Sequence, residues 1–127
     1  MHILDTNVVI HLRDGDLGVK ARTTTLDQTL AISIMTRVEL EGGVPRNAPD
    51  LPARRARLDA LLESLRTLPF DDACASRYRA IMDATDFSRR RIIDRMIAAQ
   101  ALLHDATLVT MNGEDFKDIP GLKLLIW

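Results

Sequence analysis

The chain begins Met1-His2-Ile3-Leu4-Asp5-Thr6-Asn7-Val8-Val9-Ile10, and this stretch decides how the rest is interpreted. A short apolar run ends on the carboxylate of Asp5, and two polar residues then lead into a second apolar run. The pattern predicts a buried strand over residues 2–4 and a helix capped by Thr6 or Asn7. In an open parallel sheet, ligands bind beyond the carboxyl ends of the strands, so we expect Asp5 at the mouth of a crevice.

Length and composition limit the classes of protein to consider. The chain has 127 residues, of which 46% are hydrophobic, as expected for one globular domain with a real core. The net charge of -1 excludes a global basic field, so any nucleic-acid contact must come from a local basic patch. Aromatic residues make up only 4%, which argues against recognition of nucleic acid by rows of stacked rings.

Cysteine content and apolar runs exclude several further classes. The single cysteine, Cys74, rules out an intramolecular disulfide and a multi-cysteine zinc site. No apolar run approaches the roughly 20 residues of a membrane span, and the first residues lack the pattern of a signal peptide. We therefore expect a cytoplasmic protein that does not associate with a membrane.

Apolar strand patterns alternate with helical patterns along the chain. This alternation predicts right-handed crossovers, a parallel sheet and helices on both of its faces, which is an α/β fold. The predicted strands are residues 2–4, 30–34, 67–70, 107–111 and 122–126. The predicted helices are residues 8–13, 17–28, 36–43, 53–65, one that begins at Asp71 or Asp72, and 92–104.

Two further segments bear on how the elements are connected. Thr36-Arg37-Val38-Glu39 has the Thr-x-x-Glu form of a capping box, which predicts that a helix begins there. Residues 44–52 contain three prolines and are expected to form an irregular loop.

Four acidic residues are predicted to lie at one edge of the sheet. Asp5 and Asp115 follow strands, while Glu39 and Asp94 fall in the first turns of predicted helices. Because the carboxyl ends of parallel strands and the starts of crossover helices share one edge, we expect the four carboxylates in one crevice. Clustered acids repel each other unless a cation is present, and a donor set of oxygens alone fits Mg²⁺ or Mn²⁺. Such ions activate water for phosphodiester hydrolysis.

Each acid also has a purely structural interpretation. Asp5 could cap a helix, Glu39 fits the capping box, and Asp94 in a first turn interacts favourably with the helix dipole. Asp115 could be an ordinary surface turn residue. The hypothesis therefore depends on the coincidence of the four positions. Three further acids are interpreted as solvated: Glu41, Glu114 and Asp118.

Four segments resemble the PIN-domain ribonucleases, and most closely the VapC toxins of prokaryotic toxin–antitoxin pairs. They occur in the family's order and at family-like spacing over essentially the whole chain. One departure is visible at residues 87–93, where members often carry a glycine and a proline. The segments are Ile3-Leu4-Asp5-Thr6-Asn7, residues 33–40, Asp94-Arg95-Met96-Ile97-Ala98-Ala99 and residues 108–116, followed by Pro120-Gly121-Leu122 and Trp127.

The resemblance implies a three-layer α/β/α sandwich with a central parallel sheet, formed by a single PIN-like nuclease domain over residues 1–127. It also implies an endoribonuclease that depends on Mg²⁺ or Mn²⁺, hydrolyses RNA phosphodiesters and acts as the toxin of a type II toxin–antitoxin pair. The implied partners are a cognate antitoxin and a second copy of the toxin. By position, Asp5, Glu39, Asp94 and Asp115 match the family's acidic quartet of catalytic residues and metal ligands.

The expected roles differ among these residues. Asp5 and Asp94 would be the main metal ligands, Glu39 a ligand or the group that orients the attacking water, and Asp115 would act through water or behind the groups that contact the metal. Thr6 and Asn112 lie next to acids of the quartet and are candidates for positioning substrate. The run Arg89, Arg90 and Arg91 could hold substrate phosphates or could be a solvated basic turn.

Two rival functions remain open at this point. A metal-dependent DNA nuclease would use the same phosphate chemistry. A catalytically silent PIN-fold module would act only through protein contacts, although the intact acidic quartet argues against it. Comparing cleavage of RNA and single-stranded DNA with added metal distinguishes the RNA nuclease, the DNA nuclease and the silent module.

Overall fold

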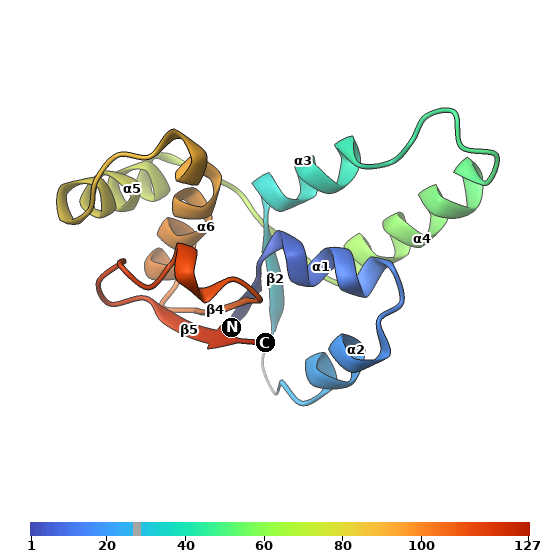
Figure 1. Ribbon diagram of the computed structural model, residues 1–127, viewed down its shortest axis with the longest axis horizontal. Helices are drawn as coiled ribbons and strands as arrows, with labels where there is room; N and C mark the ends of the chain where they lie inside the picture. Colours follow the sequence, from blue (N-terminus) through green and yellow to red (C-terminus); the bar gives the residue numbers. More distant parts are fainter. Residues whose placement is uncertain (27–28) are drawn as a thin grey trace.

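A five-stranded parallel sheet forms the middle layer of the protein (Figure 1). The computed structural model describes residues 1–26 and 29–127. The strand order is β3-β2-β1-β4-β5, and every neighbouring pair is parallel, as predicted. The strands are β1 (His2–Leu4), β2 (Leu30–Ser33), β3 (Arg66–Leu68), β4 (Thr107–Thr110) and β5 (Lys123–Ile126).

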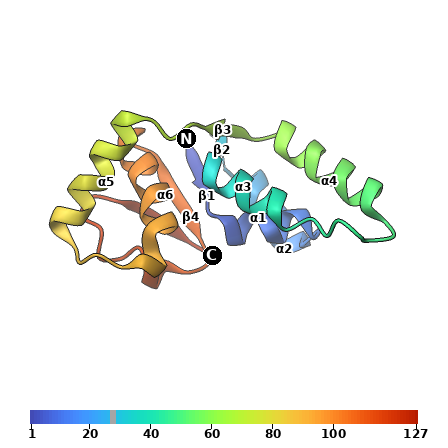
Figure 2. The ribbon, with the colours of Figure 1, turned by 90° about the horizontal axis from the view of Figure 1, so that it is seen from above.

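Helices cover both faces of the sheet, which confirms the predicted α/β/α sandwich. Figure 2 shows α5 and α6 on one side of the sheet and α1 to α4 on the other. Two short 3-10 turns, η1 and η2, lie beside this scaffold. The bounds are α1 (Thr6–Arg13), α2 (Leu17–Thr24), α3 (Ile34–Gly42), α4 (Leu51–Glu63), α5 (Asp72–Ala84), η1 (Arg89–Arg91), α6 (Ile92–Leu103) and η2 (Gly113–Asp115).

Successive strand residues pack into two separate cores. Ile3 contributes to the core beneath α5 and α6, whereas its neighbour Leu4 contributes to the core beneath α1 and α4. Both side chains are fully buried. Because helices cover both faces of the sheet, its central strands β1, β2 and β4 contain short buried apolar runs without polar alternation.

The start of α1 differs from the prediction. Asp5, and not Thr6 or Asn7, is the capping residue, and its Oδ1 accepts a hydrogen bond from the Thr6 backbone N–H at 2.8 Å. The cap lies one residue earlier because the Asp5 backbone N–H still bonds to the sheet, at Val109 O, 2.9 Å away. The chain therefore turns from strand to helix at a single residue. The helix ends before Gly15, whose φ of +79° favours glycine.

The capping box predicted for α3 is wrong. The helix begins at Ile34, directly after β2, and the Ser33 hydroxyl caps it by accepting from the Met35 backbone N–H at 3.0 Å. Thr36 is buried inside the helix, and Glu39 lies in the second turn and not the first. The serine at the end of the strand thus supplies the cap about one turn before the position that the sequence pattern indicates.

Other boundaries agree with the predictions to within a few residues. Asp71 caps α5, accepting from the Cys74 backbone N–H at 3.1 Å. The helix α4 begins at Leu51, two residues before its predicted start. Pro52 is tolerated there because backbone N–H groups in the first turn of a helix have no partner within the helix, so the N–H that proline lacks is not needed. The helix predicted for residues 17–28 ends at Thr24, and residues 27–28 lie outside the described part. Within residues 1–26 and 29–127, none of the helices is long and apolar enough to cross a membrane.

Candidate active site

The four predicted acids line one cavity of about 310 Å³ at the carboxyl ends of β1 and β4. The strand order reverses at β1, since β2 and β4 flank it, and such switch points are where ligands bind in open α/β sheets. The expectation that the carboxylates share one crevice is therefore confirmed. The lining residues are Asp5, Thr6, Asn7, Ile10, Glu39, Asp94, Asn112 and Asp115.

Asp5 is a buried carboxylate held on both of its oxygens. Only 5% of its surface is exposed. While Oδ1 caps α1, Oδ2 accepts a hydrogen bond from the Thr110 hydroxyl at 2.7 Å. Burial raises the pKa of Asp5, the two hydrogen bonds oppose this rise, and repulsion from Glu39 and Asp115 adds to it. Asp5 therefore both caps α1 and lines the cavity, so its structural and its functional interpretation agree with the same geometry.

Asp94 carries the most strongly perturbed carboxyl group of the cavity. It lies in the first turn of α6 and is partly buried. Burial, followed by repulsion from Asp5, Asp115 and Glu39, raises the pKa of Asp94 to about 6, although the nearby Arg91 acts in the opposite direction. Burial is the larger cause of this rise, and the neighbouring carboxylates add to it.

Glu39 reaches the cavity from α3 and is held by a threonine of α1. The Thr6 hydroxyl donates to Glu39 Oε2 at 2.6 Å, and the Thr36 hydroxyl oxygen lies 3.0 Å from that of Thr6. A hydroxyl has one proton to donate, so Thr36 donates to Thr6, which donates to Glu39. The structure thus uses Thr6, a predicted substrate-positioning residue, to orient an acid.

Asp115 lies in η2 between an amide and a guanidinium. The Asn112 side-chain amide donates to Asp115 Oδ2, and Arg91 Nε lies 3.8 Å from Asp115 Oδ1. Of the predicted run of three arginines, Arg91 therefore faces the acids, whereas Arg89 and Arg90 are exposed on η1.

The sequence shows a clear family relationship. The family described as the PIN domain matches residues 2–122 of the chain. This chain is a PIN-domain protein. Ribonuclease VapC2 from Rickettsia felis is 29% identical over 138 residues, which cover 100% of this chain and 98% of that protein.

Solved structures share the fold of this PIN domain. The crystal structure of VapBC2 from Rickettsia felis, bound to a DNA fragment from its promoter, has a TM-score of 0.83 and 27% identity and covers 99% of this chain and 98% of that chain. A toxin–antitoxin complex from Klebsiella pneumoniae has a TM-score of 0.79 and 26% identity and covers 98% of this chain and 96% of that chain.

Sequence reasoning missed three contributors to the PIN-domain site. Thr110 holds Asp5, Thr36 supports Thr6, and Asp118, which is exposed as expected, also lies within 3.8 Å of the Arg91 guanidinium. The sequence could have indicated Thr110, because it is a polar residue at the end of an apolar strand, in the same way that Asp5 directly follows one. Thr36 was assigned to a capping box that does not form, and Asp118 has no local signal.

The donor set of the PIN-domain cavity fits a hard divalent cation. All the titratable side chains that line it are carboxylates, and Mg²⁺ and Mn²⁺ prefer such oxygens. Burial is the main cause of the raised pKa values of Asp5 and Asp94, repulsion from neighbouring carboxylates adds to both, and a cation would offset that repulsion. Among the described residues, no three His, Cys, Asp or Glu side chains are arranged closely enough to hold an ion as they stand. The acids share a cavity without forming a complete coordination shell.

The raised pKa of Asp94 predicts a pH-dependent stability. Its pKa is about 6 in the folded protein and 3.8 ordinarily, so the folded state holds the proton more tightly. The ionised carboxylate therefore lowers the free energy of unfolding above pH 6, and this cost disappears as the pH falls from about 6 to about 4. We expect Asp94→Asn to raise the Tm of the metal-free protein at about pH 7.5 and to change it little near pH 4. Circular-dichroism melts in EDTA measure this difference, and an equal gain at both pH values would show that charge is not its cause.

Proposed function

We propose that this protein is an endoribonuclease that hydrolyses RNA phosphodiesters with Mg²⁺ or Mn²⁺ and acts as the toxin of a type II toxin–antitoxin pair. The observation that carries the proposal is the single cavity lined by Asp5, Glu39, Asp94 and Asp115, which come from four separate parts of the chain. The relative named as a ribonuclease and the structural neighbours that are toxin–antitoxin complexes support the same activity. Residues 1–127 would act as one nuclease domain in the cytoplasm, where the RNA is.

In this proposal the acids differ in role. Asp5 and Asp94 hold the metal, Glu39 is a further ligand or orients the attacking water, and Asp115 acts through water. When bound, a divalent ion of this kind supplies an activated water and neutralises charge on the phosphate.

The surrounding residues of the chain hold the acids in place. Thr110 and the Thr6 backbone N–H fix the two oxygens of Asp5, and the Thr6 hydroxyl fixes Glu39. Asn112 fixes Asp115. Groups that are already held in position lose little freedom when substrate binds, which favours catalysis. Arg89 and Arg90, exposed on η1, are candidates to bind phosphates on either side of the cleavage site.

The experiment that tests the proposal compares three classes of function. Purified protein is incubated with RNA and with single-stranded DNA of the same base sequence, in Mg²⁺, Mn²⁺ or EDTA. We expect metal-dependent cleavage of RNA alone, since the 2′-hydroxyl is the group by which a protein distinguishes the two. Equal cleavage of both would indicate a general nuclease, and cleavage of neither would indicate an interaction module.

Metal binding should be visible in stability as well as in activity. An ion present at about 100 times its dissociation constant adds roughly 2.7 kcal/mol to the free energy of unfolding, which raises the Tm by roughly 10 °C. We expect this gain in the wild type, and a much smaller one in Asp94→Asn. Thermal melts with and without Mg²⁺ or Mn²⁺ measure it, with Glu114→Gln, an exposed acid outside the cavity, as control. Equal gains in wild type and Asp94→Asn would place the ion elsewhere.

A further inference from the structure

Arg91 belongs to a row of charged side chains that leads from the protein interior to the acidic cavity. Arg95 Nη2 lies 3.3 Å from Asp118 Oδ2, and Arg91 Nη1 lies 3.8 Å from the same oxygen. On its other side, Arg91 Nε lies 3.8 Å from Asp115 Oδ1. The order is therefore Arg95, Asp118, Arg91 and Asp115, with charges that alternate in sign.

The inner end of this row is a buried cation. Arg95 follows Asp94 on α6, is only 2% exposed and also donates to the Thr85 hydroxyl at the end of α5. Its Nε has no hydrogen-bond partner among the described residues. A buried guanidinium that is incompletely bonded is poor evidence for stabilisation, because its desolvation cost can exceed the attraction of its partner. Its clearest effect is to hold the carboxylate of Asp118.

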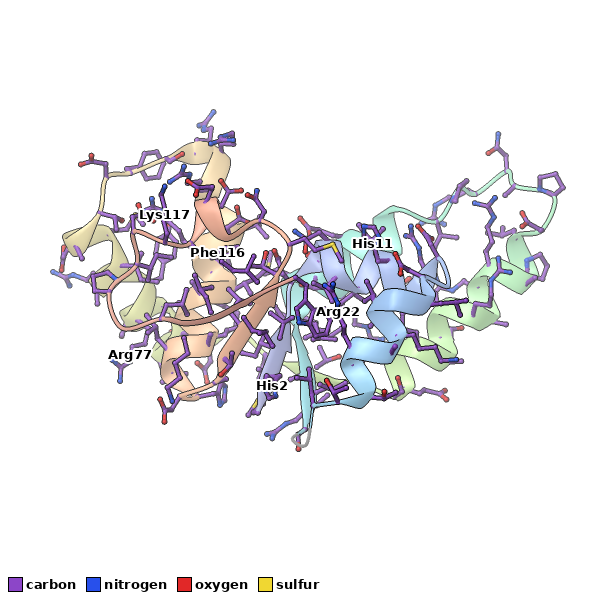
Figure 3. The ribbon with its side chains drawn as sticks, turned by 60° about the horizontal axis from the view of Figure 1, so that its bottom comes forward. His2, His11, Arg22, Arg77, Phe116 and Lys117 are labelled. Atoms are coloured by element: carbon purple, nitrogen blue, oxygen red, sulfur yellow. The ribbon has the colours of Figure 1, made fainter. Side chains whose placement is uncertain are left out.

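The backbone that carries Asp118 is also held in place. Phe116, two residues earlier, is 1% exposed and packs in the core beneath α5 and α6, whereas Lys117 is exposed at the surface (Figure 3). Asp118, whose side chain is 41% exposed, is thus attached through its chain to a buried ring and through its side chain to a buried cation. It is a fixed point beside Arg91, a long side chain at the edge of the cavity.

Arg91 itself is placed to contact an anion. Its side chain is 27% exposed, and both of its ion pairs are 3.8 Å long. Close charge-assisted hydrogen bonds are about 2.7–2.9 Å, so the two carboxylates attract the guanidinium from both sides without close hydrogen bonds to it, and its donors stay available. A guanidinium matches the oxygens of a phosphate in geometry and charge. The exposed Arg89 and Arg90 have no such support among the described residues.

We propose that Asp118, held by the buried Arg95, is a positioning residue that keeps Arg91 at the edge of the acidic cavity, where Arg91 donates hydrogen bonds to the scissile phosphate of the RNA. The proposal rests on the proposed nuclease function and deepens it. It gives Arg91 direct contact with the substrate, and it gives Asp118 and Arg95 the task of holding Arg91. It separates Arg91 from the other two arginines of the run.

A double-mutant cycle tests the proposal through RNA cleavage. We expect Arg91→Ala to lower kcat/KM by about tenfold to a hundredfold, the loss expected for a charge-assisted hydrogen bond, and Asp118→Asn to lower it by about tenfold. If Asp118 acts through Arg91, then Asp118→Asn has no further effect in the Arg91→Ala background. An equal loss from Asp118→Asn in both backgrounds, or no loss from Arg91→Ala, would overturn the proposal.

Matched controls separate positioning from general damage to the fold. Glu114→Gln removes a neighbouring acid that is paired with Lys117, and it should leave kcat/KM unchanged. Asp118→Asn leaves Arg95 buried without its charged partner, so a second variant, Arg95→Met with Asp118→Asn, removes both charges and protects folding. This variant should fold and should lose as much activity as Asp118→Asn. Wild-type activity in it would overturn the proposal.

The same assays distinguish this proposal from the proposed function. If wild type cleaves RNA, Asp94→Asn does not, and the cycle is additive, then the nuclease stands and the positioning role falls. If wild type does not cleave RNA, the nuclease function and the positioning role fall together. Arg91→Lys, which keeps the charge but not the planar fork of donors, should retain part of the lost activity.

Discussion

Asp5→Asn and Asp94→Asn will each reduce RNA cleavage by about 10³-fold or more, a loss on the scale seen when preorganised groups that stabilise transition-state charge are removed. The substitution keeps the size of each side chain and removes its negative charge. In the Asp5→Asn variant the amide oxygen can still cap α1, because it takes the place of the Oδ1 that accepts from the Thr6 backbone N–H. The Nδ2 amide then faces the Thr110 hydroxyl in place of Oδ2, so that hydrogen bond has to reverse its direction, and the negative charge is the main property that is lost.

The measurement is single-turnover cleavage of an RNA oligonucleotide at saturating Mg²⁺ or Mn²⁺, with circular dichroism to verify the fold. Glu114→Gln serves as the control, because it removes a carboxylate that lies outside the cavity and is exposed. Near wild-type turnover in either aspartate variant at saturating metal would remove that residue from the proposed metal site. Loss of activity together with loss of fold would call for Asp→Glu variants instead.

An antitoxin that lacks its basic segment will bind this protein without inhibiting RNA cleavage. The physical reason lies in the acidic cavity, where four carboxylates form a receptor for a guanidinium. We expect the partner to direct an Arg or Lys at Asp5, Glu39 and Asp94, so that it displaces metal or blocks RNA. The segment that carries this side chain would fold as it binds.

The rest of that segment needs a groove, and we expect residues 8–13 and 53–65 to form its walls. A second cavity, of about 450 Å³, lies between the end of α1, the end of α3 and α4. Its lining includes the apolar Leu58 and three arginines, Arg13, Arg54 and Arg57, together with Asp14, which pairs with Arg13. We therefore expect the partner to combine apolar and acidic residues here with a basic residue at the acidic cavity, and its binding to show moderate sensitivity to salt.

The test compares the full antitoxin with a truncated form in an RNA cleavage assay, with binding measured for both. Cleavage by the complex with the truncated form, at concentrations where the two proteins remain bound, is the expected result. Full inhibition by a fragment that never approaches Asp5, Glu39 and Asp94 would contradict it. Inhibition would then have to come from a remote effect, for example through contact with the second copy of the toxin that the family resemblance implies.

Local patterns were sufficient to predict the sheet and the acidic cavity. Buried strands of a parallel sheet are short apolar runs, and Ile3-Leu4 and Leu108-Val109 could be recognised as such without knowledge of their neighbours. The parallel direction of strands joined by helices then places strand ends and helix starts at one edge, which brings Asp5, Asp94 and Asp115 together. Glu39 reached the same cavity although its predicted position in the helix was wrong, because a long side chain tolerates an error of one turn.

The tertiary structure alone decided which of several equivalent residues makes each contact. Asp5, Thr6 and Asn7 are all good capping residues, and the choice of Asp5 follows from the strand pairing that ends at its backbone N–H. Likewise, Asp118 looks like any solvated acid until its fold places it beside Arg91 and the buried Arg95. Side-chain pairs of this kind are set by distances across the fold. Periodicity and capping rules describe neighbours along the chain, and they contain no information about such distances.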